Sequence, residues 1–446
     1  GTGIVHTAPA FGQDDYMIGM KYNLPFIQPV DDAGKFTEEV TDYKGLFVKE
    51  ADKSIIRALK DSGHLYKRSQ IIHSYPFCWR CKSPLIYYAR STWYIRTSEY
   101  KNQMIHNNQQ VNWYPQFVGE KRFGEWLDNN VDWALSRDRF WGTPLNIWKC
   151  DDCNEMVSIG SIEELRQRGK MEDGSDVPEN IELHRPFIDR IKIPCPKCQK
   201  DTYRTPEVID CWFDSGSMPF AQWHYPFENK DIFESELFPA DFISEGIDQT
   251  RGWFYTLLAI STILRGESPY KNVLVNDLIL DKNGQKMSKT RGNSVDPMEI
   301  MDKYGADAVR WYLLHVSPPW TPTKFDVKGV EEIYGKFIGT LKNVYSFYVT
   351  YASIDNFHPK DHADHTQRES ELDHWIYSKL NSLITTVVDN NEKYDFTRSL
   401  RAIQKFVLDD LSNWYVRRSR HRYWAMELTN DKIEAYLTLF EVMISL

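Results

Sequence analysis

Two lysines that lie three residues apart, Lys286 and Lys289, could both act on a triphosphate. They belong to the segment KMSKT, which follows an apolar run at residues 273–280 and a turn at residues 281–284. Positive charge on such a loop would stabilise the negative charge that develops as pyrophosphate leaves. The alternative is a solvated turn with two surface lysines.

A second group of polar residues follows the apolar strand residues at 242–243. Ligands of open α/β sheets bind at such strand-to-helix turns. Gly246 would let a ligand approach the backbone closely, and Asp248 and Gln249 suit the hydroxyl groups of a ribose. Glu245 could neutralise an ammonium group. Asp248 could instead be only the N-cap of the helix that we expect to begin near it.

The cysteines form a third pattern, because six of the seven fall in Cys-x-x-Cys pairs. The pairs are Cys78 and Cys81, Cys150 and Cys153, and Cys195 and Cys198. In a chain without secretion signals this spacing favours metal binding over disulfides. The last two pairs together supply the four thiolates of a closed, structural Zn²⁺ site, with four buried free thiols as the alternative. Cys211 is expected to be a small core residue.

The composition bounds what these residues can belong to. The chain has 446 residues, of which 41% are hydrophobic and 26% charged, which is typical of a globular protein with about two to four domains. A net charge of −9 argues against a protein that coats polyanions, although a local basic face is compatible with RNA. The chain shows neither a run of about 18 apolar residues nor a signal-peptide pattern. We therefore expect no membrane partner and a cytoplasmic protein. The first residues, 1–9, read as the interior of a domain, so we expect a fragment.

The elements that must position these residues change character along the chain. A helix is expected from about residue 50 to 62, and strands at 241–244 and 273–280 alternate with helices, as in an α/β sheet. After about residue 325, three apolar stripes predict a helix bundle. The stripes are Ile333, Phe337, Leu341 and Val344; Leu372, Trp375, Ile376, Leu383 and Val387; and Phe396, Leu400, Ile403, Val407, Leu411 and Trp414.

Several segments together resemble the class I aminoacyl-tRNA synthetases. KMSKT is similar to their KMSKS-type loop, and residues 245–254 are similar to their EGxDQxRGWF stretch. Residues 133–142 and 208–217 look like blocks of the isoleucine, valine and leucine subgroup. Residues 5–15 resemble the editing domain of the isoleucine type. The resemblance covers essentially the whole chain.

The resemblance implies a multidomain fold, α/β plus all-α. It predicts the C-terminal half of a Rossmann-like catalytic fold with a zinc-knuckle insertion, preceded by the end of a β-rich editing domain and followed by a helical bundle. The expected parts are residues 1–75 for the editing domain, 76–149 and 201–324 for the catalytic domain, 150–200 for the zinc-binding insertion, and 325–446 for a truncated anticodon-binding bundle.

The resemblance also assigns roles at the catalytic site. Lys289 would contact a phosphate of ATP, which binds with Mg²⁺ as a substrate, and Lys286 would assist. The adenylate would be bound by Gly246, Asp248 and Gln249.

The amino acid would occupy a separate part of that site. Glu245 would hold the amino group of isoleucine, and Trp212 and Trp253 would form the walls of its side-chain pocket, unless they are only core aromatics. The HIGH-type motif of the family does not occur in the chain. We therefore expect half an active site and an inactive fragment.

Editing is expected because valine lacks one methylene of isoleucine, a difference worth about 1–3 kcal/mol, a magnitude already established with synthetases of this kind. His6 and Asp15 match the editing motif of the family, and Asp15 would anchor the ammonium of a misacylated amino acid. The alternative is a solvated acidic turn. The family's editing pocket also uses a threonine-rich segment that does not occur in the chain.

The RNA partner would be tRNA(Ile), bound by a basic cluster of a monomeric protein. Four arginines near the third stripe, with aromatic residues between them, could contact phosphates and bases. They are Arg417, Arg418, Arg420 and Arg422. The alternative is a solvated helix end. The family resemblance also places the partner of the pair Cys78 and Cys81 outside the chain, so a second metal site there would be incomplete.

Three other interpretations remain at this point. A valine-specific synthetase is the nearest, and the segment 5–15 argues against it. A non-catalytic zinc-ribbon module that binds RNA would explain the cysteines and arginines but not KMSKT or residues 245–254. A natural split half that pairs with a partner chain is the third.

Overall fold

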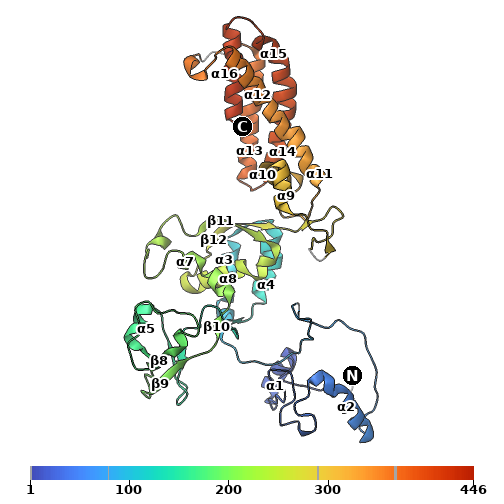
Figure 1. Ribbon diagram of the computed structural model, residues 1–446, viewed down its shortest axis with the longest axis vertical. Helices are drawn as coiled ribbons and strands as arrows, with labels where there is room; N and C mark the ends of the chain where they lie inside the picture. Colours follow the sequence, from blue (N-terminus) through green and yellow to red (C-terminus); the bar gives the residue numbers. More distant parts are fainter. Residues whose placement is uncertain (1–2, 79, 289–290, 366–368) are drawn as a thin grey trace. The chain divides into compact units, whose positions relative to one another are not determined.

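A computed structural model describes residues 3–78, 80–288, 291–365 and 369–446 (Figure 1). The chain separates into two compact units, Gly1–Trp93 and Tyr94–Leu446. Each unit has its own contacts and is described by itself. In the described parts of the chain, no helix combines the length and the apolar character that crossing a membrane requires.

The first unit contains two helices, α1 (Gln13–Tyr22) and α2 (Val48–Asp61). Helix α2 confirms the helix expected from about residue 50 to 62. In the described residues of the segment 1–75, extended runs pair only at isolated bridges, such as Val30 with Phe36 and Lys35 with Phe47. Each run meets its partner at a single residue pair, so no ladder of hydrogen bonds propagates.

The centre of the second unit is a parallel sheet of three strands in the order β11-β12-β2. The strands are β2 (Asn112–Tyr114), β11 (Ala240–Gly246) and β12 (Tyr270–Asn276). The helix α8 (Trp253–Arg265) connects β11 to β12, as parallel pairing requires, and ends at Gly266 in the left-handed region. β11 and β12 confirm the two predicted strands, although the second ends at Asn276 and resumes as β13 (Ile279–Leu280).

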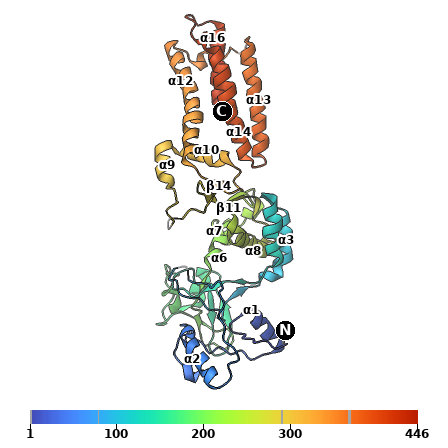
Figure 2. The same ribbon diagram turned by 90° about the vertical axis from the view of Figure 1, so that its right-hand side faces the viewer.

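The core of this part lies between the sheet and the helices that pack on it (Figures 1 and 2). Ile243, Val273 and Val275 face α8 and α3 (Lys101–Gln109), because alternate side chains of a strand share one face. The smaller elements are β1 (Tyr94–Ile95), a π-helical segment (Val118–Phe123), α4 (Gly124–Asp128), β3 (Trp133–Ala134), β4 (Ser136–Arg137), β10 (Val208–Ile209), α6 (Cys211–Gly216) and α7 (Met218–Ala221).

Residues between β4 and β10 form a separate antiparallel sheet in the order β6-β5-β9-β8-β7. Its elements are β5 (Ile147–Lys149), β6 (Met156–Ser158), α5 (Ile162–Arg168), β7 (Lys170–Met171), β8 (Ile191–Pro194) and β9 (Asp201–Arg204). Trp148 is fully buried in its core and donates its indole N–H to the Ile191 carbonyl at 2.8 Å. The segment therefore has a small hydrophobic core of its own.

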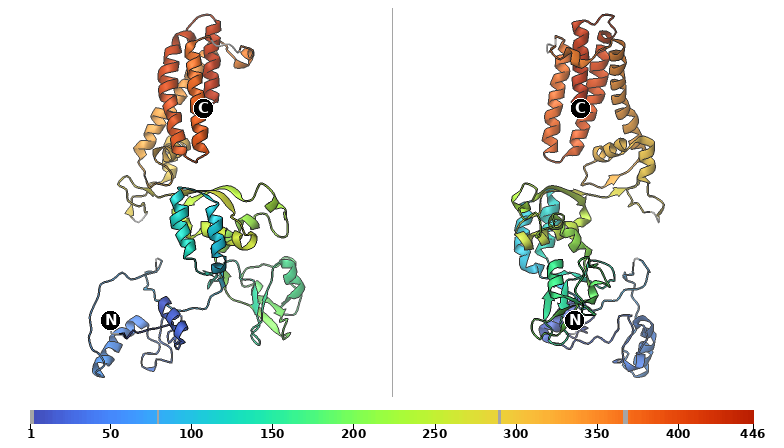
Figure 3. Two further views of the ribbon diagram at one scale, coloured as in Figure 1. Left: turned by 180° about the vertical axis from the view of Figure 1, so that it is seen from behind. Right: turned by 60° about the vertical axis from the view of Figure 1, so that its left-hand side comes forward.

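The residues from Pro297 onward are mainly helical and share one hydrophobic core (Figures 2 and 3). The helices are α9 (Pro297–Tyr304), α10 (Ala306–Val316), α11 (Val327–Glu332), α12 (Gly339–Ile354), α13 (Glu371–Asn391), α14 (Phe396–Lys405), α15 (Arg417–Tyr423) and α16 (Asn430–Ile444); π-helical segments cover Ile333–Ile338 and Phe406–Val416, and β14 (Thr323–Lys324) pairs with β13. Ile333, Ile376 and Leu411 are buried, which confirms the three predicted stripes, whereas Trp414 is 48% exposed.

Candidate active site and metal centre

The turn after β11 carries the predicted ligand-binding residues at the carboxyl edge of the sheet. Glu245 pairs with Val275 and Gly246 with Asn276, so both lie where two parallel strands end. Glu245 and Asp248 are exposed, and Gln249 is half-buried. The carboxyl edge of an open parallel sheet is the place where such folds bind ligands.

The helix expected to begin near Asp248 begins at Trp253 instead. A 3-10 turn covers Ile247–Arg251, and Gly252 is the N-cap of α8. The N-cap interpretation of Asp248 is therefore wrong. The Gln249 side chain takes this role in part, because its Oε1 accepts the Trp253 backbone N–H at 2.9 Å, while its Nε2 donates to Asp248 at 3.2 Å.

Trp212 lies close to Gly252, the residue that precedes Trp253 at this turn. A β-carbon at position 252 would lie 3.3 Å from the Trp212 ring and 2.5 Å from the Gln249 Oε1. The Trp253 indole N–H donates to the Ser215 carbonyl at 3.2 Å, which ties α8 to the helix that carries Trp212. Trp212 is 40% exposed and Trp253 half-buried, so Trp212 is not a core aromatic.

A buried carboxylate fixes the segment that carries Trp212. Asp210 is 4% exposed and is the N-cap of α6, where it accepts the Trp212 backbone N–H at 3.3 Å. It also accepts from Arg137 at 2.6 Å and from the Trp133 indole at 3.3 Å. The two sequence blocks 133–142 and 208–217 therefore meet through one ion pair.

Asp214, one turn further along α6, is held by Thr143, the residue that follows the block 133–142. Its Oδ2 accepts the Thr143 hydroxyl at 3.0 Å. Burial raises the pKa of the Asp214 carboxyl, and the nearby charge of Asp210 raises it further. The carboxyl group is thus easier to protonate than an exposed aspartate.

The loop with the two lysines begins at β13 and is closed by polar side chains. Asp281 accepts the backbone N–H groups of Asn283 at 2.9 Å and Gln285 at 2.8 Å, and it lies 2.9 Å from the amide nitrogen of Asn293. Lys286 is exposed. The prediction for Lys289 lies outside the described residues.

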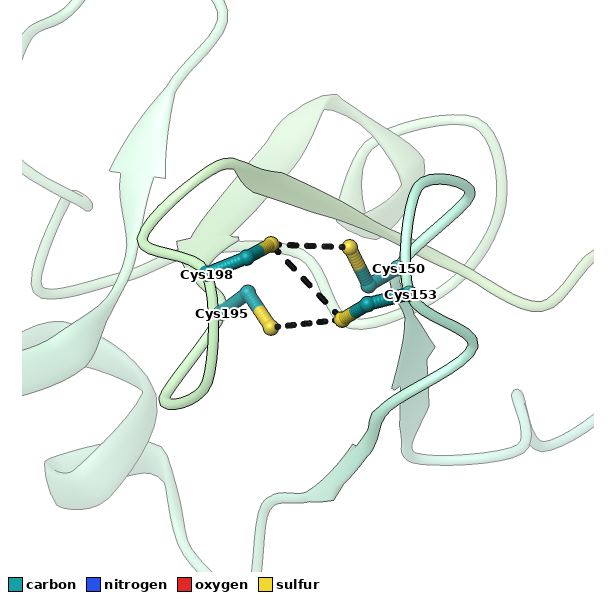
Figure 4. A group of neighbouring side chains, drawn as sticks. All are labelled: Cys150, Cys153, Cys195 and Cys198. Atoms are coloured by element: carbon teal, nitrogen blue, oxygen red, sulfur yellow. Dashed lines mark hydrogen bonds between the residues drawn. The ribbon is translucent and has the colours of Figure 1, made fainter.

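The structure brings together the four cysteines predicted to bind zinc (Figure 4). Their sulfur atoms all lie within 4.8 Å of one another, and the distances are 3.5 Å for Cys150–Cys198, 3.5 Å for Cys153–Cys195 and 3.6 Å for Cys153–Cys198. Tetrahedral Zn²⁺ with Zn–S bonds of about 2.3 Å separates its sulfurs by about 3.8 Å. The donor set therefore fits Zn²⁺.

The backbone of each pair is shaped to direct two sulfurs to one point. Cys150 donates its N–H to the Glu155 carbonyl, and Asn154, with φ 58°, donates to the Cys150 carbonyl. Cys195, Lys200 and Gln199 repeat the same pattern, with φ 61° at Gln199.

The thiol of Cys195 ionises more readily than an ordinary cysteine. Desolvation by burial raises its pKa, but the N–H groups of Cys198 and Lys197, together with the thiols of Cys153 and Cys198, outweigh that effect and lower the pKa to about 7. The pKa of its neighbour Cys153 is raised to about 12. A thiolate, not a thiol, is the form that binds zinc.

The third pair, Cys78 and Cys81, has the same loop geometry in the first unit. Cys78 donates its N–H to the Ser83 carbonyl, and Lys82, with φ 60°, donates to the Cys78 carbonyl. A hydrogen bond from Ser83 lowers the pKa of the exposed Cys81 to about 7. Cys211, which we expected in a core, is exposed because it begins α6 at the surface.

The two residues assigned to editing lie near one another in sequence and fold. His6 is exposed. Asp15 lies in α1, and its Oδ2 accepts the Ala8 backbone N–H at 3.2 Å, so its carboxylate faces the segment that follows His6.

The four arginines assigned to RNA do not share one environment. Arg417, Arg418 and Arg420 are exposed on α15, and the Arg418 guanidinium lies 4.8 Å from the centre of the Trp414 ring. Arg422 is 4% exposed and binds the carboxylate of Asp373. The assignment of Arg422 to RNA contact is corrected: helical periodicity turns it toward the bundle.

Three residues that support the site have no assigned role in the sequence analysis. Asp210 lies inside a recognised block, and its position directly before a helix is a usable N-cap signal. Gly252 and Asn293 offer no such signal, because their roles depend on side chains that come close only in the folded chain.

These features can be compared with known proteins. The family model for tRNA synthetases class I (I, L, M and V) matches residues 34–326, and the model for the anticodon-binding domain of tRNA ligase matches residues 373–446. The structure of methionyl-tRNA synthetase from Mycobacterium tuberculosis with methionyl-adenylate aligns with a TM-score of 0.56 at 16% identity, over 97% of this chain and 75% of that chain. That likeness is one of fold.

Curated relatives match the chain along its whole length. The isoleucine–tRNA ligase of Clostridium acetobutylicum is 54% identical over 446 residues, which are 100% of this chain and 42% of the relative. The isoleucine–tRNA ligase of Clostridium novyi is 53% identical over 443 residues, which are 99% of this chain and 42% of the relative. The chain thus spans 42% of the length of these relatives.

Proposed function

Because the chain belongs to the class I tRNA synthetases of the isoleucine, leucine, methionine and valine group, we propose that it forms part of an isoleucine–tRNA ligase. The reaction has two steps. The carboxylate of isoleucine attacks the α-phosphate of ATP and releases pyrophosphate, and the terminal ribose of tRNA(Ile) then takes the acyl group from the adenylate. Neither step needs a protein nucleophile, so the enzyme acts by positioning and by stabilising charge.

The observation that carries the proposal is the turn after β11, which follows Glu245, brings Gly252 close to the Trp212 ring and leads into Trp253. The two tryptophans would offer apolar rings to a branched aliphatic side chain. Glu245 is the last but one residue of β11 and is exposed, so it can pair with an ammonium group. An apolar wall beside one carboxylate is the recognition chemistry of an aliphatic amino acid.

The nucleotide would occupy the turn beside this pocket. Gly246 leaves the backbone accessible, and Asp248 and Gln249 are bonded to each other and can orient toward ribose hydroxyls. Lys286 and Lys289 would neutralise the phosphates, with Mg²⁺ bound to ATP as part of the substrate. The exposed position of Lys286 agrees with a group that meets a ligand from solvent.

The four-cysteine centre would hold a structural Zn²⁺. Four thiolates fill a tetrahedral ion and leave no position for water, so the ion would stabilise the small sheet and take no part in the reaction. The small hydrophobic core of this segment makes such a cross-link valuable, since few buried side chains hold it otherwise.

Two further functions follow from the family. Arg417, Arg418 and Arg420 would contact tRNA from the surface of α15, where Trp414 could stack on a base. His6 and Asp15 would contribute to hydrolysis of valine attached to tRNA(Ile), with Asp15 holding the ammonium.

Pyrophosphate exchange by the complete gene product tests the proposal. The expected result is ATP–pyrophosphate exchange that depends on isoleucine, with a kcat/KM for valine about 10- to 200-fold lower. Exchange that prefers valine would make the protein a valine–tRNA ligase. Zinc and RNA binding without exchange for any amino acid would favour a non-catalytic RNA-binding module.

A further inference from the structure

The side chain of Asn293 closes the loop that carries Lys286. The Nδ2 of Asn293 donates to Asp281 Oδ2 at 2.9 Å and to the Lys286 carbonyl at 3.3 Å, while its Oδ1 accepts the Ser288 backbone N–H at 2.9 Å. The amide of Asn293 thus bonds to three points of the loop, namely Asp281 at its base, Lys286 and Ser288. Asn293 is half-buried, although its chain neighbours are exposed.

The base of the loop is built to receive this amide. The Oδ1 of Asp281 accepts the backbone N–H groups of Asn283 and Gln285, which leaves Oδ2 for Asn293. Leu280 pairs with Lys286 as an isolated bridge, and Gly284 turns the chain with φ 82°. The carboxylate therefore has a fixed orientation before Asn293 binds it.

The residue directly before Asn293 is a glycine in the left-handed region. Gly292 has φ 67°, with open space around the position of a β-carbon, so the turn requires backbone freedom and not close packing. The bonds from Asn293 to Asp281, Lys286 and Ser288 form a clasp. Outside it, the loop residues Lys282 and Asn283 are exposed, as is the Lys286 side chain. Hydrogen bonds of side chains and backbone, and not deep hydrophobic burial, hold the described part of the loop.

From this geometry we infer that Asn293 is a positioning residue, which acts together with Asp281 to hold Lys286 and Ser288 in the conformation that presents the loop to its ligand. That the ligand is the triphosphate of ATP rests on the proposed function. Asn293 itself donates and accepts only within the loop and takes no part in the reaction.

A reciprocal exchange of the two side chains tests the inference. In Asn293→Asp, two carboxylate oxygens face each other, and in Asp281→Asn, two amide nitrogens face each other. In the double variant, the amide at position 281 can again donate to the carboxylate at position 293. That carboxylate can still accept from Ser288, and the amide oxygen at position 281 can still accept from Asn283 and Gln285. Only the 3.3 Å bond to the Lys286 carbonyl is lost.

The first measurement is hydrogen exchange of the Ser288 backbone amide in the complete gene product. We expect the Ser288 amide to exchange at least about tenfold faster in each single variant, because the side chain at position 293 that accepts its N–H is displaced. In the double variant the exchange rate should return to that of the wild type. Asn283→Ala is the matched control, since Asn283 contributes its backbone N–H to the loop. Unchanged exchange in the single variants, or no recovery in the double variant, would overturn the inference.

The second measurement is isoleucine-dependent pyrophosphate exchange with ATP varied. We expect kcat to fall about 10- to 100-fold in each single variant, because a displaced Lys286 stabilises the transition state less, and to recover in the double variant. The melting temperature should stay unchanged throughout. A melting temperature that falls in parallel with kcat would make Asn293 a general structural residue and would overturn the inference.

The two measurements separate the inference from the function on which it rests. If the wild-type protein lacks isoleucine-dependent exchange but the Ser288 amide follows the expected pattern, the proposed function fails and the clasp stands. If the wild-type protein is active and the amide does not follow the pattern, the clasp fails and the proposed function stands.

Discussion

Arg422 and Asp373 form a bidentate ion pair inside the helical bundle, with nitrogen–oxygen distances of 2.7 and 2.9 Å. The two side chains are 4% and 0% exposed. Tyr415 adds its hydroxyl to the same carboxylate at 2.6 Å, and Arg422 also donates to the Asp431 carbonyl at 2.9 Å. The pair therefore joins α13 to α15, and the bond to Asp431 adds the first turn of α16.

Arg422→Ala should destabilise the bundle. Removing one member of a buried ion pair leaves an uncompensated charge and costs about 3–5 kcal/mol. Chemical denaturation followed by circular dichroism would measure the loss. Arg418→Ala is the matched control, because Arg418 is exposed on the same helix and should change stability by less than about 0.5 kcal/mol. Equal stability of the two variants would contradict the assigned role of Arg422.

Arg418→Ala should weaken tRNA binding without loss of stability. The exposed guanidinium beside Trp414 can contact a phosphate, and its loss should lower affinity and reduce the salt dependence of binding by about one ion. Filter binding of tRNA(Ile) to the complete gene product over a range of salt concentrations would measure both. Unchanged affinity and slope would remove Arg418 from the RNA interface.

The purified chain should contain about one zinc ion per molecule on its four clustered cysteines. Cys195→Ser removes one of four sulfur ligands and should deplete the metal, as elemental analysis can show. Cys211→Ser is the control, because Cys211 is exposed at the start of α6 and lies outside the cluster. A zinc content that is the same in both variants would refute the site.

Glu245→Gln should impair use of isoleucine in the complete gene product. The change keeps the shape of the side chain but removes the charge that pairs with the ammonium group. Loss of a charge-assisted hydrogen bond should lower kcat/KM for isoleucine about 10- to 150-fold, with little change in the KM for ATP. Steady-state exchange kinetics with each substrate varied would decide. A change confined to ATP would assign Glu245 to the nucleotide.

Gly252→Ala should disturb the packing of the turn before Trp253 against Trp212. The added carbon would lie 2.5 Å from the Gln249 Oε1 and 3.3 Å from the Trp212 ring, so both must shift. Overpacking of this kind costs about 1–3 kcal/mol, and we expect the KM for isoleucine to rise by about 5- to 150-fold.

Gly335→Ala is the matched control for this change. Gly335 lies in a π-helical segment with open space around it, so an added methyl group should be tolerated. If both variants keep the wild-type KM for isoleucine, Gly252 does not shape the pocket.

The sequence predicts the strands of this fold better than the places where its helices begin. Ile243 and Val273 lie in short apolar runs, which are typical of buried parallel strands, and both fall in the observed sheet. The start of α8 was predicted five residues too early, near Asp248 instead of Trp253, because the stretch between them reads as helical. What delays the helix is the hydrogen bond from Trp253 to the Gln249 side chain, which only a folded turn provides.

The candidate site shows the same limit. The spacing of the cysteines is enough to predict that Cys150 and Cys195 share one site, because each Cys-x-x-Cys pair is a local motif with fixed backbone geometry. Arg422 looked like its neighbours in a basic run, and only its partner Asp373, 49 residues away, reveals that it is buried. Long-range partners of this kind, like Asn293 for Asp281, leave no periodic signal in the sequence.

The way in which the zinc-binding segment is connected makes it an exchangeable module. The chain leaves along β5 and returns along β9, which are paired antiparallel, with Trp148 opposite Arg204. Just outside, β4 pairs with β10 in the same sense. Entry and exit are therefore neighbours, and the length of chain between them is unconstrained by the catalytic sheet. Evolution could lengthen, shorten or replace this segment, and an engineer could graft a reporter domain there, without altering the strand that carries Glu245.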